Sequence, residues 1–168
     1  RDALFQIGAI HEAREEYGEA EAAFRAQIEA KSDHSRARLH LGLVLKLVGR
    51  TDESVGLLGG VVAGPGPQQR RALLELAQVY QARREFGRSE SLFGHYIAEL
   101  EPKEQAVYYD LSLVAGGQDL DQFRAAARKE WKAQSEVFWA GRDPAPVTAA
   151  NERLLTHYRR VAFAREHF

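Results

Sequence analysis

His11 is the residue of this chain that comes closest to a metal-binding pattern. It is followed by Glu12 and Glu15 in a segment with helical spacing. A zinc site of the HExxH type needs two histidines four residues apart on one helix, and Glu15 occupies the second position. We therefore predict that His11 packs within a helical repeat and binds no metal.

His157 marks a second segment of chemical interest, because Arg153, Arg159 and Arg160 lie close to it. Such a cluster could bind an anion. However, glutamates at 152 and 166 accompany the arginines, and mixed charges of this kind are ordinary on the exposed side of a helix. We expect His157 to lie on a solvated helix face.

Patterns for other enzyme chemistry are incomplete. The glycine-rich stretch GGVVAGPG at 59–66 lacks the Lys and Ser or Thr that complete a phosphate-binding P-loop. The chain contains no cysteine, which excludes disulfides, thiolate metal ligands and cysteine nucleophiles. The sequence predicts no catalytic residue, no cofactor and no metal site.

The overall composition is that of a folded globular chain. Of its 168 residues, 45% are hydrophobic and 28% are charged, and the net charge is −1. Acidic and basic residues are interspersed, and no apolar run approaches the roughly 20 residues that span a bilayer. We expect neither a nucleic-acid partner nor direct insertion into a membrane.

A repeat organises the first 101 residues, and its copies are offset by 34 and then 35 residues. Small residues recur where the two helices of a hairpin must approach each other, and large apolar residues recur where successive hairpins meet. The small positions are Gly8, Gly42 and Ala77 with Ala20, Ser54 and Ser89, and the large ones are Phe24, Leu58 and Phe93. The pattern predicts stacked helical hairpins.

The period and the order of these residues resemble the tetratricopeptide repeat family, with copies at about 1–34, 35–68 and 69–101. The resemblance implies an all-α, right-handed α-solenoid of about three hairpins, followed here by additional C-terminal helices. The second copy departs from the family at Arg38, where an aromatic residue is usual. A generic helical bundle is the alternative.

In that family the first helix of each hairpin lines a concave groove that binds extended peptides or partner helices. The resemblance implies that this groove is lined by Asp2, Phe5, Ala9, Glu12, Arg36, Leu39, Leu43, Lys46, Arg71, Leu74, Gln78 and Gln81. Such a surface suits a partner with apolar anchors and an acidic group near Arg36, Lys46 or Arg71. The alternative is that these positions are simply solvated.

Residues 102–168 are predicted to form further helices. One helix should run from Lys103 until Gly116 and Gly117 end it, and the next should run from Asp119 or Asp121 through Trp139. Asp143 precedes Pro144, so this second helix should end by Arg142. Thr148 is then the expected N-cap of a final helix.

The final helix is expected to present apolar residues on two faces. Leu155 and Tyr158 lie on one face, while Phe163 lies on nearly the opposite one. No Gly, Asn or Pro stop signal follows it, so we expect the helix to continue beyond Phe168. The residues expected to contact the following segment are Trp139, Arg142, Asp143, Phe163 and Phe168.

Two stretches of this region, VYYDLSLVAG and FWAGRDPAPVTAANERLLTHYRRVAFAREHF, carry a second resemblance. Residues 103–168 resemble the helical N-terminal part of the bacterial GWxTD domain, whose mostly β segment would follow Phe168. This resemblance implies a bacterial protein, with the cell envelope favoured over the cytoplasm. It implies no defined activity.

These observations together predict a non-catalytic scaffold for protein–protein interaction. It would bind a peptide, a partner helix or its own C-terminal region. The alternative is the helical part of an enzyme or ligand-binding protein whose site is completed by a following segment. Self-association through the end of the repeat array, giving a homo-oligomer, is a third possibility.

Overall fold

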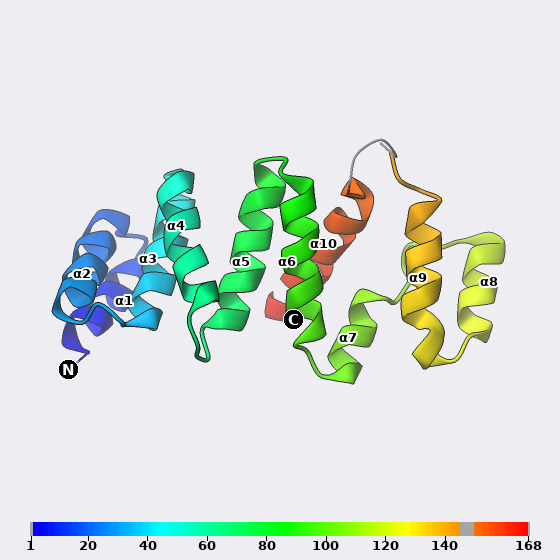
Figure 1. Cartoon of the computed structure of the whole chain (residues 1–168), viewed down its shortest axis with the longest axis horizontal. Coiled ribbons are helices and arrows are strands. Elements are labelled where there is room, and N and C mark those ends of the chain that lie inside the picture. Colours follow the sequence, from blue (N-terminus) through cyan, green and yellow to red (C-terminus); the bar gives the residue numbers. More distant parts are fainter. Residues whose placement is uncertain (1, 145–149, 168) are drawn as a thin grey trace. The chain divides into compact units, whose positions relative to one another are not determined.

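The computed structural model describes residues 2–144 and 150–167, and within these ranges all regular structure is helical (Figure 1). The helices are α1 (Ala3–Ala13), α2 (Tyr17–Ala30), α3 (Ser35–Leu47), α4 (Thr51–Ala63), α5 (Gln69–Ala82), α6 (Phe86–Ala98), α7 (Pro102–Tyr108), α8 (Gly117–Ala125), the 3-10 helix η1 (Arg128–Glu130), α9 (Trp131–Ala140) and α10 (Glu152–His167). The prediction of an all-α fold built from consecutive hairpins is confirmed.

The chain forms two compact units, Arg1–Val79 and Tyr80–Phe168, which we call unit 1 and unit 2. Their boundary falls inside α5. The expected division into repeats at 1–101 and an extension at 102–168 is based on family resemblance and stays a prediction.

Unit 1 contains two helical hairpins, α1–α2 and α3–α4, which stack in chain order. A Cβ atom added to Gly8 would lie 2.6 Å from the ring of Phe24, and one added to Gly42 would lie 2.9 Å from Leu58. The expected close approach of the two helices at Gly8 and at Gly42 is therefore confirmed in both hairpins.

The turn that follows α1, α3 and α5 repeats at the level of the backbone. Glu15, Gly49 and Arg84 all have positive φ angles, of 60°, 81° and 62°. The amide that follows each of them donates to a carbonyl five residues earlier, with N···O distances of 2.9, 2.8 and 2.9 Å. This is the Schellman ending of a helix, and its recurrence after 34 and 35 residues matches the period found in the sequence.

The core of unit 1 is apolar, and its buried polar groups are hydrogen-bonded. Its buried residues are Phe5, Ala20, Phe24, Ala37, Leu41, Val44 and Leu45. Gln27 is buried, and its Oε1 accepts a hydrogen bond from the amide of Phe5 at 3.1 Å. The hydroxyl of Ser54 donates to the carbonyl of Gly42 at 2.8 Å. These two contacts tie each second helix to the first helix of its hairpin.

In unit 2 the helix expected from Lys103 to Gly116 is shorter than predicted, because α7 ends at Tyr108. Asp110 accepts a hydrogen bond from the amide of Ser112 at 2.8 Å, and this turn redirects the chain. Leu111 is buried as a result. Burial of this side chain offsets the helical hydrogen bonds that are given up.

The prediction of a single helix between Asp119 and Trp139 is also wrong. It is divided into α8 and α9 by an extended backbone at Ala126, with φ −80° and ψ 145°. The break brings the rings of Phe123 and Trp131 to a centroid distance of 4.8 Å. Both helices can then bury an apolar face in one cluster, which contains Leu111, Phe123, Phe138 and Trp139.

The N-cap of α10 is Asn151 and not Thr148. The side-chain oxygen of Asn151 accepts hydrogen bonds from the amides of Arg153 and Leu154, at 3.0 and 3.1 Å. These are two of the free N–H groups that every helix start must satisfy. Thr148 itself lies outside the described residues.

Candidate functional site

The predicted groove residues of unit 1 include several that are buried. Phe5, Leu39 and Leu74 are each at most 3% exposed. The ring of Phe5 is stacked on His34 at a centroid distance of 5.5 Å, and the guanidinium of Arg36 lies 4.4 Å from its centre. Phe5 is thus covered by its own chain.

Other predicted groove residues are paired with neighbours inside unit 1. The carboxylate of Glu12 lies 2.6 Å from Nδ1 of His40. Lys46 and Arg71 both contact Glu75, at 2.5 and 2.6 Å, and the side chain of Glu75 is only 3% exposed. These two cations therefore neutralise a buried carboxylate of the same chain.

The rest of the predicted groove set is only partly accessible. Ala9, Leu43 and Gln78 are half-buried, Gln81 is buried, and Asp2 is exposed, with Oδ1 3.3 Å from Nε2 of His34. On the predicted groove surface of unit 1, most polar side chains thus contact other side chains of the same unit. Sequence reasoning missed the role of His40, whose partner Glu12 lies on another helix, and of Glu75, which is paired with Lys46 of α3 as well as with Arg71 of its own helix.

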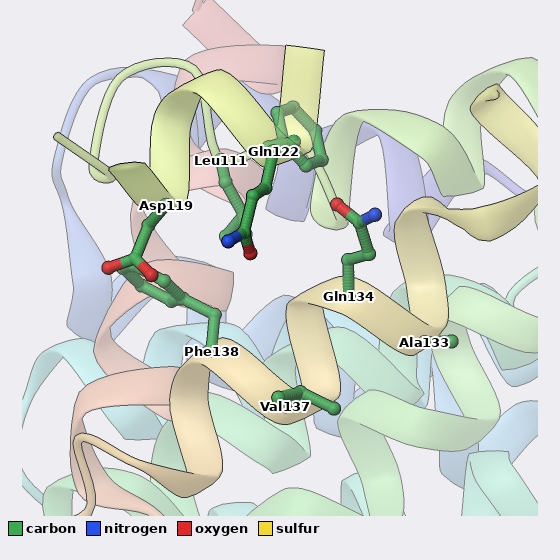
Figure 2. A pocket seen from close by; sticks show the side chains of 8 residues that line it. Leu111, Asp119, Gln122, Ala133, Gln134, Val137 and Phe138 are labelled. Carbon is green, nitrogen blue, oxygen red and sulfur yellow. The ribbon is translucent and has the colours of Figure 1, made fainter. Parts of the chain in front are cut away.

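Arg142, expected to contact a following segment, holds α8 to the end of α9. It donates to the carboxylate of Asp119 at 2.5 Å, and its guanidinium lies 3.8 Å from the ring centre of Phe138. Asp119 and Phe138 line a cavity of about 270 Å³. Figure 2 shows these two side chains next to each other. Gln122 and Gln134 extend into this cavity from α8 and α9 (Figure 2).

The other residues of that predicted set lie in different environments. Trp139 is buried, and its carbonyl accepts a hydrogen bond from Asn151 at 2.5 Å. Asp143 is half-buried. Phe163 is exposed and is stacked on His167 at 4.0 Å. Phe168 lies outside the described residues.

The expectation that His157 lies on a solvated face is wrong. His157 is buried against Trp139, at a ring distance of 5.2 Å, and its Nε2 lies 3.0 Å from the carbonyl of Tyr108. Burial lowers its pKa, partly offset by this hydrogen bond. The buried face of α10 thus includes a polar residue that the apolar pattern does not indicate. His157 can be buried there because its imidazole is hydrogen-bonded to the carbonyl of Tyr108, which is left free where α7 ends.

A larger cavity lies along α10, and we call it the α10 hollow. Its volume is about 570 Å³. It is lined by Val107, Asp110, Leu113, Val114, His157, Arg160, Val161, Ala164 and Arg165. A smaller cavity of about 320 Å³ shares Val114, His157 and Arg160 with it and adds Trp139, Arg153 and Thr156. The two cavities are therefore neighbours along α10.

The walls of the α10 hollow are apolar and accessible. Leu113 is 96% exposed, Val107 46% and Val114 41%. Leu113 and Val114 belong to the turn that replaces the end of the predicted helix. An aliphatic cluster of this kind is a surface to which apolar groups of a partner can bind.

The charged residues at the rim of the α10 hollow are mainly positive. Within the described part of the chain, Arg153 and Arg160 have no ion-pair partner. Arg165 is paired with Glu104, and the carboxylate of Asp110 already accepts from the amide of Ser112. The rim therefore favours a ligand that carries negative charge.

Comparison with protein-family models, with curated proteins and with solved structures finds no match to this chain. Among the described residues, no group of His, Asp and Glu side chains is arranged to hold a metal ion. None of the described helices has the length and apolar character needed to cross a membrane.

Proposed function

We propose that this chain is a non-catalytic interaction module and that unit 2 binds a helix of a partner protein in the α10 hollow. The partner helix would place aliphatic side chains on Val107, Leu113 and Val114. Its acidic residues would lie near Arg153 and Arg160. The observation that carries the proposal is the exposed aliphatic cluster next to two arginines that lack ion pairs among the described residues.

Binding of this kind has a sufficient driving force. Covering one exposed leucine side chain contributes about 1.5–3 kcal/mol, and Leu113 is almost fully exposed. Amphipathic helices bind such depressions through anchors spaced three or four residues apart. The arginines add selectivity, since a basic helix would meet like charges at the rim.

The titratable residues at this site favour binding over catalysis. His157 is buried and donates its hydrogen bond to a backbone carbonyl, while burial keeps its pKa below the ordinary value. Asp110 stabilises a turn. Neither side chain is placed as a base beside a nucleophile, which catalysis of that kind requires.

The internal repeat supports a wider proposal about the chain. Its period and small-residue positions support a tetratricopeptide-like origin for residues 1–101. The order of residues in 103–168 supports a relation to the helical part of the GWxTD domain. Both families are proposed here on sequence features alone.

The binding proposal can be tested with two synthetic helical peptides that share the same leucine anchors. One carries Glu at the flanking positions and the other carries Lys. We expect the Glu peptide to bind to the α10 hollow, with NMR amide shifts confined to residues 107–114 and to α10. We expect Leu113→Asp to weaken it tenfold or more, a loss of about 1.4 kcal/mol.

Charge exchange at Arg160 tests the selectivity of the same site. Arg160→Glu should weaken the Glu peptide and strengthen the Lys peptide. Leu47→Asp, at a 59% exposed leucine of unit 1, and Arg124→Glu on α8 are matched controls that should change neither. Equal binding of both peptides, or self-association that Leu113→Asp abolishes, would overturn the partner-helix proposal.

A further inference from the structure

A separate cavity of unit 2, which we call the basic pocket, has a volume of about 420 Å³. It lies between α7 and the segment around η1. Its lining residues are Pro102, Lys103, Gln105, Ala106, Tyr109, Arg128, Lys129 and Lys132. Four of these eight residues are cations and none is acidic, so the pocket wall carries an excess of positive charge.

These cations are largely without internal partners. In the part of the chain that the structure describes, Lys103, Arg128 and Lys129 form no ion pair. Lys132 lies 3.9 Å from Glu136, a long contact between two exposed side chains, which contributes little. The nearby Glu104 is engaged by Arg165, and Glu130 accepts from the amide of Ala127 at 3.3 Å.

The fold brings these cations together from two separate segments. Lys103 lies in the first turn of α7, whereas Arg128 and Lys129 belong to η1. The backbone break at Ala126 creates η1, and the contact between Glu130 and Ala127 closes its first turn. Arg128 is further positioned by Trp131, whose ring centre lies 5.2 Å from the guanidinium.

The pocket also contains a neutral donor. Tyr109 is half-buried, and burial, with Glu136 as a smaller cause, raises the pKa of its phenol. The phenol therefore keeps its proton at neutral pH and can donate a hydrogen bond. A protonated phenol among ammonium and guanidinium groups gives a site made of donors, which suits the oxygens of a phosphoryl group.

We propose that the basic pocket binds a ligand with two linked phosphoryl groups. One phosphoryl group carries about −1.5 to −2 charges near neutral pH, so a single group would leave part of the four cationic charges uncompensated. Two linked groups carry more negative charge than one and compensate these cations more fully. The diphosphate can belong to a free small molecule or to a lipid headgroup, because both present the same oxygens. This site is independent of the α10 hollow.

Inorganic pyrophosphate is the probe for this site, titrated into the whole chain by calorimetry at constant ionic strength. We expect saturable binding of one pyrophosphate per chain. The variants Arg128→Gln and Lys129→Gln should each weaken it about tenfold, since a charge-assisted hydrogen bond contributes about 1.5–3 kcal/mol. Lys31→Gln, at an exposed lysine of unit 1, is the matched control and should leave binding unchanged.

Three further measurements make the result decisive. Lys129 is exposed, and its side chain forms no hydrogen bond or ion pair within the described residues. Its variant therefore tests binding without a risk to folding, and thermal unfolding verifies this. Vesicles with a diphosphate lipid headgroup that bind more tightly than pyrophosphate, with the same dependence on Arg128, would identify the lipid as the source. The proposal would be overturned if sulfate binds as tightly as pyrophosphate, or if both variants bind pyrophosphate as tightly as the unchanged chain.

Discussion

At the scale of single residues, Glu75 is a buried carboxylate that depends on two cations of its own chain. Its carboxylate is almost completely removed from solvent and contacts the side chains of Lys46 and Arg71. A buried charge destabilises a protein when it loses its partners, even where the intact pair adds little stability. Lys46 and Arg71 therefore matter for stability because they neutralise this buried carboxylate.

We expect Lys46→Met to lower the free energy of unfolding by about 1–2 kcal/mol. This is less than the roughly 3–5 kcal/mol lost when a fully buried pair is broken, because Arg71 stays as a second cation and Lys46 is partly exposed. Urea unfolding followed by circular dichroism measures the change. Lys31→Met, at an exposed position, should change it by less than about 0.5 kcal/mol.

The double variant Lys46→Met with Glu75→Leu tests the cause. Removing both charges should restore most of the lost stability, since no buried carboxylate remains. If the double variant is less stable than Lys46→Met, the loss comes from packing of the lysine stem and not from the carboxylate.

His157 should make the stability of unit 2 depend on pH. Burial is the main cause of its lowered pKa, so the folded pKa lies below the ordinary value of 6.5. Between these two values the unfolded chain binds a proton that the folded chain does not. Unit 2 therefore has its full stability above pH 6.5. It loses part of that stability as the pH falls from 6.5 through the pKa of His157 in the folded chain.

Thermal and urea unfolding between pH 7.5 and pH 5 check this dependence. His157→Gln keeps a donor for the carbonyl of Tyr108 but does not titrate. We expect it to remove part of the slope, which reaches at most about 1.4 kcal/mol per pH unit for one group. His95→Gln, at an exposed histidine of α6, should leave the slope unchanged. An identical slope in all three proteins would contradict the assignment.

At the scale of the helices, Gly8 and Gly56 of unit 1 have opposite surroundings. Gly8 is pressed against the ring of Phe24, whereas Gly56 in α4 has open space beside it. We expect Gly8→Ala to destabilise the chain by about 1–3 kcal/mol through overpacking. Gly56→Ala should stabilise it by about 0.5–1 kcal/mol, because alanine favours the helix. Thermal unfolding of the two variants measures both signs.

The hairpins of unit 1 could be predicted from sequence because their signals are local. The small residues at 8 and 42 mark close approach, and the turn after each helix recurs with the same period. The breaks at 109–116 and at Ala126 could not be predicted in this way. They depend on burial of Leu111 and on the contact between Phe123 and Trp131, and neither is marked by a repeated pattern in the sequence.

The candidate sites were harder to predict than the elements. The sequence places Lys46 and Arg71 on helices but does not show that both contact Glu75. Arg71 and Glu75 are four residues apart on one helix, whereas the contact of Lys46 with Glu75 depends on how the helices pack. The α10 hollow could not be predicted, because Leu113 and Val114 fall within the sequence pattern of a helix. Aliphatic residues in a predicted helix are expected to be buried, so their exposure becomes clear only once the turn after α7 is known.

At the scale of the whole molecule, binding should change the unfolding temperature. A ligand that binds only the folded chain adds RT ln(1 + [L]/Kd), which is about 2.7 kcal/mol at a hundredfold excess over Kd. We expect the Glu peptide to raise the unfolding temperature at this excess. At the same peptide concentration, Leu113→Asp should reduce this stabilisation to about 1.4 kcal/mol or less, because the peptide binds at least tenfold more weakly. Leu47→Asp should preserve the full rise. An undiminished rise in Leu113→Asp would place the peptide elsewhere.

The near-zero net charge of the chain hides its local electrostatics. The total is −1, yet both the rim of the α10 hollow and the basic pocket are positive. Acidic residues elsewhere balance the sum. A neutral total therefore excludes a molecule that is basic throughout but not small cationic sites of the kind found in unit 2.

The recurring Schellman turns also make the chain suitable for duplication. Residues 16–49 begin just after one left-handed residue and end on the next, at Glu15 and Gly49. A second copy of this segment, inserted after Gly49, would join its neighbours through the same backbone conformation and would need no new loop. Such a lengthened chain should stay helical and unfold cooperatively, and so offers a direct route to longer arrays of the same hairpin.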